Sequence, residues 1–322
     1  MRKHVICCCI FLLFLAAQAA NAPAAEQDVT AAEQNVLGVE QDTSSFERMQ
    51  KLAEQGNAEA QFGMGTVYEY GQFVTKDYDK ALEWYRKAAE QGHAGAQFGI
   101  GFFHANGWGV PKNEAEAVGW FRKAAKQGYA PAFFNLGIMY ANGLGVPKNE
   151  AEAVTWWSKA AELGDADSQF SLGIMYEAGN GVPKDEAKAV EWYRKAAEQG
   201  QDKAQYNLGV MYASGRGVAK NEAEAAAWWN KAAEQRNFDA QFNLGVMYYE
   251  GQAVPQDYAK ALELFQEVAA QNDADAQFNL GIMYYEGHGV TKDSRKACEF
   301  LRLAKEQNLK EAVTLYNKSC VQ

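Results

Sequence analysis

The chain has 322 residues, of which 48% are hydrophobic and only six are proline, and its formal net charge is −10. An acidic chain lacks the basic surface that nucleic-acid phosphates and anionic lipids require, so its composition argues against binding to either of them. The low proline content favours a helical fold over a turn-rich β fold.

Residues 1–24 have the pattern of a secretory signal peptide. Residues 2–4 are basic, residues 5–17 form an apolar run, and small residues follow as far as Ala24. A retained membrane anchor is the alternative, but a helix that spans a bilayer needs about 20 apolar residues and this run is shorter. We therefore expect a bacterial protein that is exported, either to the periplasm or out of the cell, with its signal peptide cleaved. No integral membrane segment is expected after cleavage.

Residues 25–44 are polar and acidic and show no sustained apolar period, which predicts a flexible linker. From residue 45 to residue 322 the chain repeats itself with a period of 36 residues, marked by glycines such as Gly65 and Gly71. Half-repeats occupy residues 45–56 and 309–322. The seven full repeats are predicted to span residues 57–92, 93–128, 129–164, 165–200, 201–236, 237–272 and 273–308.

Each repeat is predicted to hold two helices joined by a short turn. In the third repeat, an apolar stripe of helical period runs through residues 131–142, and Gly143 ends this first helix. Asn149, with Glu152 three residues later, predicts a capping box at the start of the second helix.

The small and large residues of a repeat predict close packing. We expect the central glycine of the first helix, such as Gly137, to let two helix backbones approach each other. The aromatic pair of the second helix, such as Trp156 and Trp157, would fill the space between the helices. One repeat cannot bury these faces alone, so stability should build along a stacked array.

The repeated pattern is A-x-x-x-L-G-x-x-Y-x-x-G-x-G-V, followed by D/N-x-x-x-A-x-x-W-Y-x-x-A-A-x-x-G. It resembles the Sel-one-like repeat, a longer relative of the tetratricopeptide repeat, over residues 46 to about 317. The resemblance implies an all-α fold, a right-handed α/α superhelix (solenoid) of seven helix–turn–helix repeats with half-repeat caps. It also implies a concave groove lined by the first helices, and a scaffold or adaptor role. Bacterial members of the family are often exported.

Side chains suited to catalysis or metal binding are scarce. After residue 24 the histidines are His93, His104 and His288, which are not spaced as metal ligands on one helix turn. The Gly-x-Gly-Val loops, such as residues 143–146, lack the preceding strand and the third glycine of a dinucleotide-binding loop, so we interpret them as helix–helix turns. We therefore expect no enzyme activity, no cofactor and no metal site.

An apolar row on the first helices is the candidate site for a partner. Phe or Tyr occupies one position of every repeat, and Thr, Phe, Ile or Val occurs four residues later. If this row is partly exposed, it forms a groove for a protein or peptide segment; if neighbouring first helices bury it, it is core, and both alternatives stay open. The residues expected to line the groove are Phe98, Tyr129, Phe133, Phe134, Ile138, Asn142, Phe170, Tyr206, Phe242, Tyr249, Phe278 and Tyr285.

Some positions of this set differ from repeat to repeat. The third repeat has Phe133 where the other six have Gln, with Tyr129 and Pro131 just before it. We favour a local repacking, in which proline starts the helix, over an aromatic hot spot for binding. The residues nearest the end of the first helix, such as Asn142 and Tyr249, vary most, and we expect partner specificity there.

Two cysteines, Cys298 and Cys320, remain after residue 24. They lie on either side of the turn near Asn308, at similar distances from it, so an antiparallel helix pair would bring them together. We expect a disulfide in an oxidising compartment, against the alternative of two free thiols.

The sequence thus predicts an exported, non-enzymatic scaffold that binds a protein or peptide segment in a groove. The alternative is a binder of a cell-wall ligand of the peptidoglycan type with at most weak hydrolase activity. The oligomeric state is not predicted.

Overall fold

The computed structural model describes residues 43–321. The expected signal peptide and nearly all of the expected linker lie outside the described residues. The described chain contains sixteen α-helices and no strand.

The chain divides into two compact units, and the first ends at Gln91. Its described helices are α3 (Thr43–Glu54), α4 (Ala58–Tyr70) and α5 (Tyr78–Glu90). Helix α3 begins two residues before position 45, where we expected the repeat array to start. The core of this unit contains the buried residues Ala53, Ala60 and Met64, with Trp84 packed against them.

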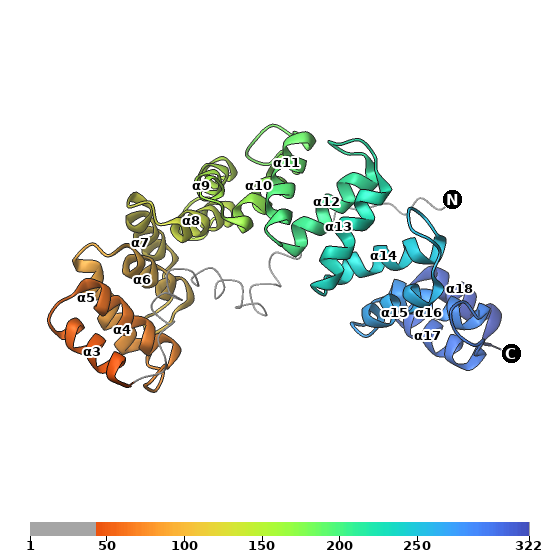
Figure 1. Ribbon diagram of the computed structural model, residues 1–322, viewed down its shortest axis with the longest axis horizontal. Helices are drawn as coiled ribbons and strands as arrows, with labels where there is room; N and C mark the ends of the chain where they lie inside the picture. Colours follow the sequence, from red (N-terminus) through yellow and green to blue (C-terminus); the bar gives the residue numbers. More distant parts are fainter. Residues whose placement is uncertain (1–42, 322) are drawn as a thin grey trace. The chain divides into compact units, whose positions relative to one another are not determined.

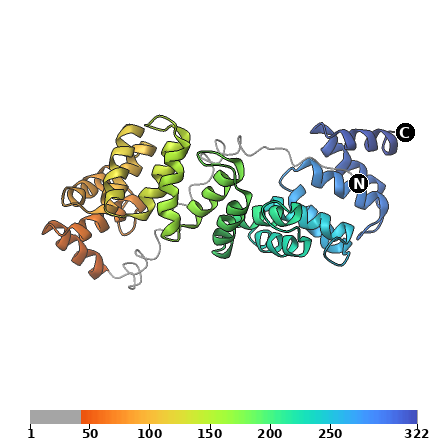
Figure 2. The ribbon, with the colours of Figure 1, turned by 90° about the horizontal axis from the view of Figure 1, so that it is seen from above.

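The second unit begins at Gly92 and follows the same helical plan. Its helices are α6 (Ala94–Asn106), α7 (Glu114–Lys126), α8 (Ala130–Asn142), α9 (Glu150–Glu162), α10 (Ala166–Ala178), α11 (Glu186–Glu198), α12 (Asp202–Ser214), α13 (Glu222–Glu234), α14 (Phe238–Glu250), α15 (Tyr258–Ala269), α16 (Ala274–Glu286), α17 (Ser294–Glu306) and α18 (Lys310–Ser319). Each of these helices packs against the next one along the chain, a succession that can be followed in Figures 1 and 2. Nearest-neighbour stacking of this kind defines a solenoid, so the prediction of an all-α solenoid is confirmed.

First and second helices differ in exposure. In Figure 1, α8 and α10 lie on the inner side of the curve that this unit follows, and α9 and α11 lie on its outer side. On α9, Thr155 and Lys159 are exposed, whereas on α8 the side chains of Phe134 and Ile138 are half-buried. The first helices therefore present a partly covered apolar face, and the second helices present a charged face to water.

The start of each second helix is fixed by a side-chain cap. Oδ1 of Asn149 accepts a hydrogen bond from the backbone N–H of Glu152 at 3.1 Å, which is one half of the predicted capping box. The backbone N–H of Asn149 donates instead to the carbonyl of Tyr140 at 2.8 Å, and not to the Glu152 side chain. That bond ties the loop back to the first helix, so the second half of the predicted box is replaced by a contact within the repeat.

The central glycine of the first helix faces an aromatic ring in six repeats, and in the seventh repeat Gly281 faces Leu301. A Cβ atom on Gly137 would overlap the indole of Trp157, and one on Gly209 would overlap the indole of Trp229. The equivalent Gly173 faces Tyr193 in the same way. The expected close approach is therefore real, but its partner is the second aromatic residue of the same repeat.

The Gly-x-Gly loops join the two helices of one repeat and contact the preceding repeat. Gly145 has φ 68°, and a Cβ there would collide with the backbone of Glu114 and Ala115 at the start of α7. Gly217 meets the backbone of Glu186 and Ala187 at the start of α11 in the same manner. Both the left-handed backbone and the lack of space require glycine at these positions. These loops are helix–helix turns that dock on the preceding repeat, as their sequence context indicated.

Candidate functional site

A row of half-buried apolar side chains follows the first helices of the second unit. We call it the first-helix lane. Its residues are Phe98, Phe134, Phe170, Tyr206, Phe242 and Phe278, with Phe102, Ile138, Ile174, Val210, Val246 and Ile282 four residues later. Each residue of the lane is neither fully buried nor fully exposed. The lane therefore lies between the two alternatives of groove and core.

Contacts within and between repeats explain the burial of the lane. The ring of Phe98 packs against Phe121 and Tyr129, with centroids 5.4 Å apart in both pairs. Phe170 packs on Tyr193 at 5.9 Å, and the equivalent Phe242 packs on Phe265 at 5.7 Å. One side of each of these three rings thus packs on neighbouring rings, and the side chain stays partly accessible.

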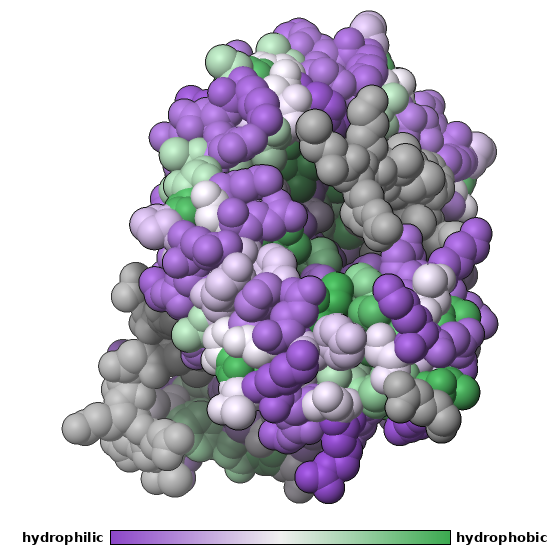
Figure 3. Space-filling model, turned by 90° about the vertical axis from the view of Figure 1, so that its right-hand side faces the viewer, coloured by the Kyte–Doolittle hydropathy of each residue, from purple (hydrophilic) through white to green (hydrophobic). Residues whose placement is uncertain are grey.

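The other residues predicted for the groove differ in accessibility. Asn142 is exposed, and its side chain donates to the carbonyl of Ile138 at 3.0 Å. Tyr285 is also exposed, Tyr129 and Tyr249 are half-buried, and Phe133 is buried. Hydrophilic residues cover most of the face that Figure 3 shows, and hydrophobic residues appear between them in small patches.

A buried glutamine joins three helices in the fifth repeat. The side chain of Gln235, at the C-cap of α13, donates to Oε1 of Gln205 on α12 at 2.8 Å. Gln205 in turn donates through Nε2 to the carbonyl of Ala197 on α11 at 3.1 Å. The last carbonyls of a helix lack partners within it, so this bond satisfies an acceptor that would otherwise need water. The second and fourth repeats have the same glutamine pair, at 2.8 Å in each.

The third repeat replaces both members of that pair, with Phe133 on α8 and Leu163 at the C-cap of α9. Only 8% of Phe133 is exposed, and its ring stacks on Trp156 with centroids 6.0 Å apart. The double replacement supports local repacking as the reason for Phe133. That side chain offers little surface to a partner, whereas Leu163 is 61% exposed.

In two repeats, the variable residue near the end of the first helix contacts the loop of the following repeat. In the fourth repeat Glu177 accepts from Arg216 of the next loop at 2.8 Å. In the sixth, the Tyr249 hydroxyl lies 3.0 Å from Nδ1 of His288. In both cases the loop residue follows 39 positions later. Sequence reasoning assigned these positions to partner specificity and missed the match, which is visible only when residues 39 apart are compared.

Where this position is glutamate, it also accepts a hydrogen bond from the second helix of its own repeat. The Tyr193 hydroxyl donates to Glu177 at 2.6 Å, and the equivalent Tyr85 donates to Glu69 in the first unit. Burial raises the pKa of the Tyr193 phenol well above its usual value, and the Glu177 carboxylate adds to the rise. Tyr193 therefore stays protonated and keeps donating at physiological pH. Where the helix end carries alanine, as at Ala141, the ring beneath is Trp157, which has no hydroxyl.

Aromatic residues gather where the loop of the seventh repeat meets the sixth. The imidazole of His288 stacks on Tyr258 with centroids 4.5 Å apart and planes 6° apart. Nδ1 of His288 is 3.2 Å from a carboxylate oxygen of Glu286. Burial, followed by the negative charge of Glu286, raises the pKa of Tyr249 to about 12. Tyr249 thus contributes to the contact between these repeats, in addition to any role in binding.

Two histidines, His93 and His104, lie on or at the start of helix α6. His93 caps α6, because its Nδ1 accepts from the backbone N–H of Ala96 at 3.1 Å. His104 is half-buried on the same helix. Within residues 43–321, no three His, Cys, Asp or Glu side chains are grouped so that they could hold a metal ion. No helix in that range is long and apolar enough to cross a membrane.

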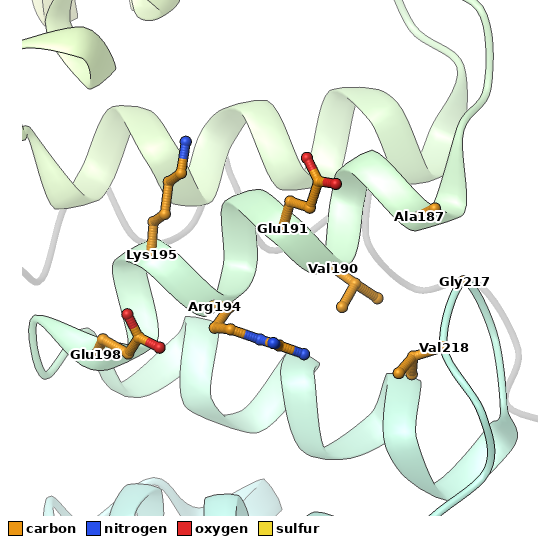
Figure 4. A pocket seen from close by; sticks show the side chains of 8 residues that line it. All are labelled: Ala187, Val190, Glu191, Arg194, Lys195, Glu198, Gly217 and Val218. Carbon is orange, nitrogen blue, oxygen red and sulfur yellow. The ribbon is translucent and has the colours of Figure 1, made fainter.

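A shallow depression of about 400 Å³ lies on α11 beside the loop of the next repeat. Figure 4 shows Val190 and Val218 on one side of it, with Glu191 and Lys195 pointing away from Val218. Its charged side chains lie on the exposed face of α11. A water-exposed patch of both charges offers little binding energy, since exposed ion pairs contribute about 0–1 kcal/mol.

The terminal helix is joined to its neighbour through sulfur. The sulfur atoms of Cys298 on α17 and Cys320 at the end of α18 form a disulfide pair 2.01 Å apart, and the Cα atoms are 5.6 Å apart. Helix α18 buries only Ala312 and has no side-chain N-cap bond. The cysteine pair is thus the strongest connection of α18 to the array.

A family model described as Sel1 repeat matches residues 58–93, 94–129, 130–165, 166–201, 202–237, 238–273 and 274–309. The chain belongs to the Sel1 repeat family. Each match begins one residue after a repeat boundary expected from the sequence. Sel1 repeat proteins generally mediate protein interactions as scaffolds, and they are typically non-enzymatic.

Solved Sel1 repeat structures resemble this chain closely. The protective antigen c5321 of uropathogenic Escherichia coli, which displays an SLR fold, is 41% identical with a TM-score of 0.82. That similarity covers 84% of this chain and 58% of the E. coli chain, so this chain spans little more than half of that length. A Sel1 repeat protein from Oxalobacter formigenes is 31% identical with a TM-score of 0.67, over 95% of this chain and 92% of its own. Comparison with curated proteins finds no match.

Proposed function

We propose that this Sel1 repeat protein is an exported, non-enzymatic scaffold that holds a segment of a partner protein along the first-helix lane. The half-exposed aromatic and aliphatic residues of the lane carry the proposal, because they continue through every repeat of the second unit. An extended or helical segment can place apolar anchors on such a row. The cysteine pair at the C-terminal end supports export, since disulfides persist in oxidising compartments.

The charges of the first helices indicate what kind of segment fits. Helices α6 and α8 contain no Asp, Glu, Lys or Arg. The later first helices carry one base, Lys203, among seven acids, which are Asp167, Glu177, Asp202, Asp239, Glu250, Asp275 and Glu286. Charge complementarity therefore favours a segment that is apolar at one end and basic at the other.

The lane can be tested by removing apolar surface at half-buried positions. We expect the double variant Ile138→Ser, Ile174→Ser to lose capture of protein partners from an extract of the cell envelope, because each change removes an anchor. The control is Leu163→Ser, which removes an exposed apolar side chain outside the lane. This variant should keep full capture.

Thermal unfolding of the same variants separates binding from stability. An unfolded double variant would show that the lane is core, and a folded variant that still captures partners would remove the lane from the binding site. Retention of the unchanged protein on isolated peptidoglycan, without capture of any protein, would replace the scaffold with a binder of cell-wall ligands.

A further inference from the structure

In five consecutive repeats the second helix carries the same pair of residues. A tryptophan is followed three positions later by a lysine, and the lysine ammonium lies over the indole ring. The pairs are Trp84–Lys87, Trp120–Lys123, Trp156–Lys159, Trp192–Lys195 and Trp228–Lys231, with the nitrogen 3.5 to 4.2 Å from the ring centroid. The indole fills the space beside the second helix, and the cation shields the ring from water.

The sixth repeat changes both members of the pair. Leu264 stands at the tryptophan position and Glu267 at the lysine position. A smaller side chain and the opposite charge leave an open cavity of about 730 Å³ between α13, α14 and α15. Its wall includes Phe238, Leu244 and Tyr248 beside Leu264. This volume lies within the range that ligand pockets usually have.

The residue Gln241 lines this cavity, and its side chain carries a buried acceptor without a partner in the described chain. Gln241 is only 3% exposed, and no group in the described chain hydrogen-bonds to its Oε1 atom. In the fifth repeat the equivalent oxygen, on Gln205, accepts from Gln235 at the end of the second helix. Helix α15 ends one residue earlier than α13, and no bond forms between Gln271 and Gln241. Leaving a buried acceptor unsatisfied is unfavourable, so the site favours a ligand that brings a donor.

The carboxylate of Glu267 lies beside that acceptor. It accepts from Nε2 of Gln241 at 2.6 Å, while the same nitrogen donates to the carbonyl of Ala233 at 3.3 Å. Around the cavity, Glu234, Glu263 and Glu267 outnumber Arg236 and Lys260 by three to two. Both bases are over aromatic rings, Lys260 at 5.0 Å from the Tyr248 centroid and Arg236 at 6.0 Å from that of Phe238.

We propose that this cavity binds an arginine side chain of a partner polypeptide. The apolar stem would pack on Leu264 and Leu244, where the first five repeats have indole. The planar guanidinium would donate to Oε1 of Gln241 and to Glu267 at once, because it carries five N–H groups in a fixed fork. The ligand thus replaces both missing members of the tryptophan–lysine pair.

The cavity is independent of the first-helix lane. Gln241, Leu244 and Tyr248 follow one another at helical spacing on one side of α14, whereas Phe242 and Val246 lie on the opposite side. A peptide in the lane therefore does not reach the cavity directly. Failure of either proposal leaves the other intact.

The test uses the whole protein with labelled leucine methyl groups, followed by NMR. The probes are N-acetyl-L-arginine amide and N-acetyl-L-norleucine amide, which has a stem of similar length but no charge. We expect the arginine probe to shift the methyl signals of Leu244 and to bind at least tenfold more tightly than the norleucine probe. Equal affinity for the two probes, or no shift at Leu244, overturns the proposal. Tighter binding of free L-arginine than of the blocked probe overturns the assignment to a polypeptide.

Restoring the common pair should close the site. The double variant Leu264→Trp, Glu267→Lys is expected to keep or raise the thermal midpoint and to lose at least tenfold in affinity for the arginine probe. Its matched control is Phe300→Trp, Leu303→Lys, which makes the same pair in the seventh repeat and should bind as before. Unchanged affinity in the folded Leu264→Trp, Glu267→Lys variant rejects the site.

A second, more conservative variant tests the charge of Glu267 without changing the packing of the cavity. Glu267→Gln keeps the size of the side chain and its ability to accept from Gln241, but removes the negative charge. We expect at least tenfold weaker binding of the arginine probe with little change for norleucine. Equal weakening of both probes would show that charge plays no part.

Discussion

Glycine in the middle of the first helix is required by the ring that lies on it. At Gly137 the neighbour is the indole of Trp157, which leaves no room for a Cβ atom on the helix backbone. Helix propensity alone would favour alanine here, by about 1 kcal/mol. Packing outweighs propensity at this position, because an added methyl group forces the buried indole to move.

We expect Gly137→Ala to lower the free energy of unfolding by about 1–2 kcal/mol, since overpacking of a core costs about 1–3 kcal/mol and is only partly offset by helix propensity. Gly119→Ala is the matched control. This glycine is exposed in α7, and a Cβ there meets no atom within 4 Å. In the control, the free energy of unfolding should rise by about 0.5–1 kcal/mol. Urea denaturation measures both, and a stabilised Gly137→Ala would contradict the ring contact.

In the third repeat, Phe133 and Leu163 together replace a pair of glutamines. We therefore expect the stability effects of substitutions at the equivalent residues of the fifth repeat, Gln205 and Gln235, to depend on each other. Gln205→Phe alone should destabilise the protein by about 1–3 kcal/mol, because the Ala197 carbonyl loses its donor. Adding Gln235→Leu should recover about 0.5–1 kcal/mol, since the two residues are in contact. A double-mutant cycle with Gln235→Leu alone completes the measurement. Strict additivity would show that the two positions do not act as a pair.

At the scale of elements, the last helix depends on a covalent link. Helix α18 buries a single residue and lacks a side-chain cap at its start. Packing of its apolar face on α17 is therefore weak compared with that of the inner helices, each of which has a neighbour on both sides. The cysteine pair adds a covalent connection to this packing.

We expect reduction of the Cys298–Cys320 pair to lower the hydrogen-exchange protection of α18 while the inner helices keep theirs. A disulfide that closes a loop with a sequence separation of 22 stabilises the folded state by about 3 kcal/mol, because it lowers the entropy of the unfolded chain. The double variant Cys298→Ser, Cys320→Ser should exchange like the reduced protein and should not respond to reductant. A free-thiol count of two in the untreated protein would show that the bond does not form.

Over the whole molecule, stability depends on contacts between successive repeats. Energies of such an array are close to a sum of repeat terms and nearest-neighbour terms. The neighbour terms are not identical here, because Glu177–Arg216 is charged and Tyr249–His288 is aromatic. These two interfaces therefore differ in the chemistry of their contacts.

Deleting one 36-residue repeat should therefore shorten the array without unfolding it. We expect removal of residues 129–164 or of residues 201–236 to preserve helical circular dichroism and to reduce the urea m-value by about a seventh, in proportion to the surface exposed. The second deletion should have the lower urea midpoint, because it leaves Glu177 without Arg216. Loss of helical signal in both deletions would show that the array folds only at full length.

The sequence by itself determined the helices, their order and the repeat length. These follow from local rules, because caps, glycines and apolar periodicity act within a few residues of one another, as at Asn149 and Gly143. The pairing of Cys298 with Cys320 was also accessible, since both cysteines flank a single turn.

Only the tertiary structure decided what the irregular residues do. Phe133 is buried against Trp156, the helix ends Glu177 and Tyr249 contact loop residues 39 positions ahead, and the joint change to Leu264 and Glu267 accompanies the cavity of the sixth repeat. Each of these depends on contacts between residues far apart in the chain, whose distances no local period encodes. The half-burial of the first-helix lane has the same origin, because exposure depends on how closely neighbouring repeats stack.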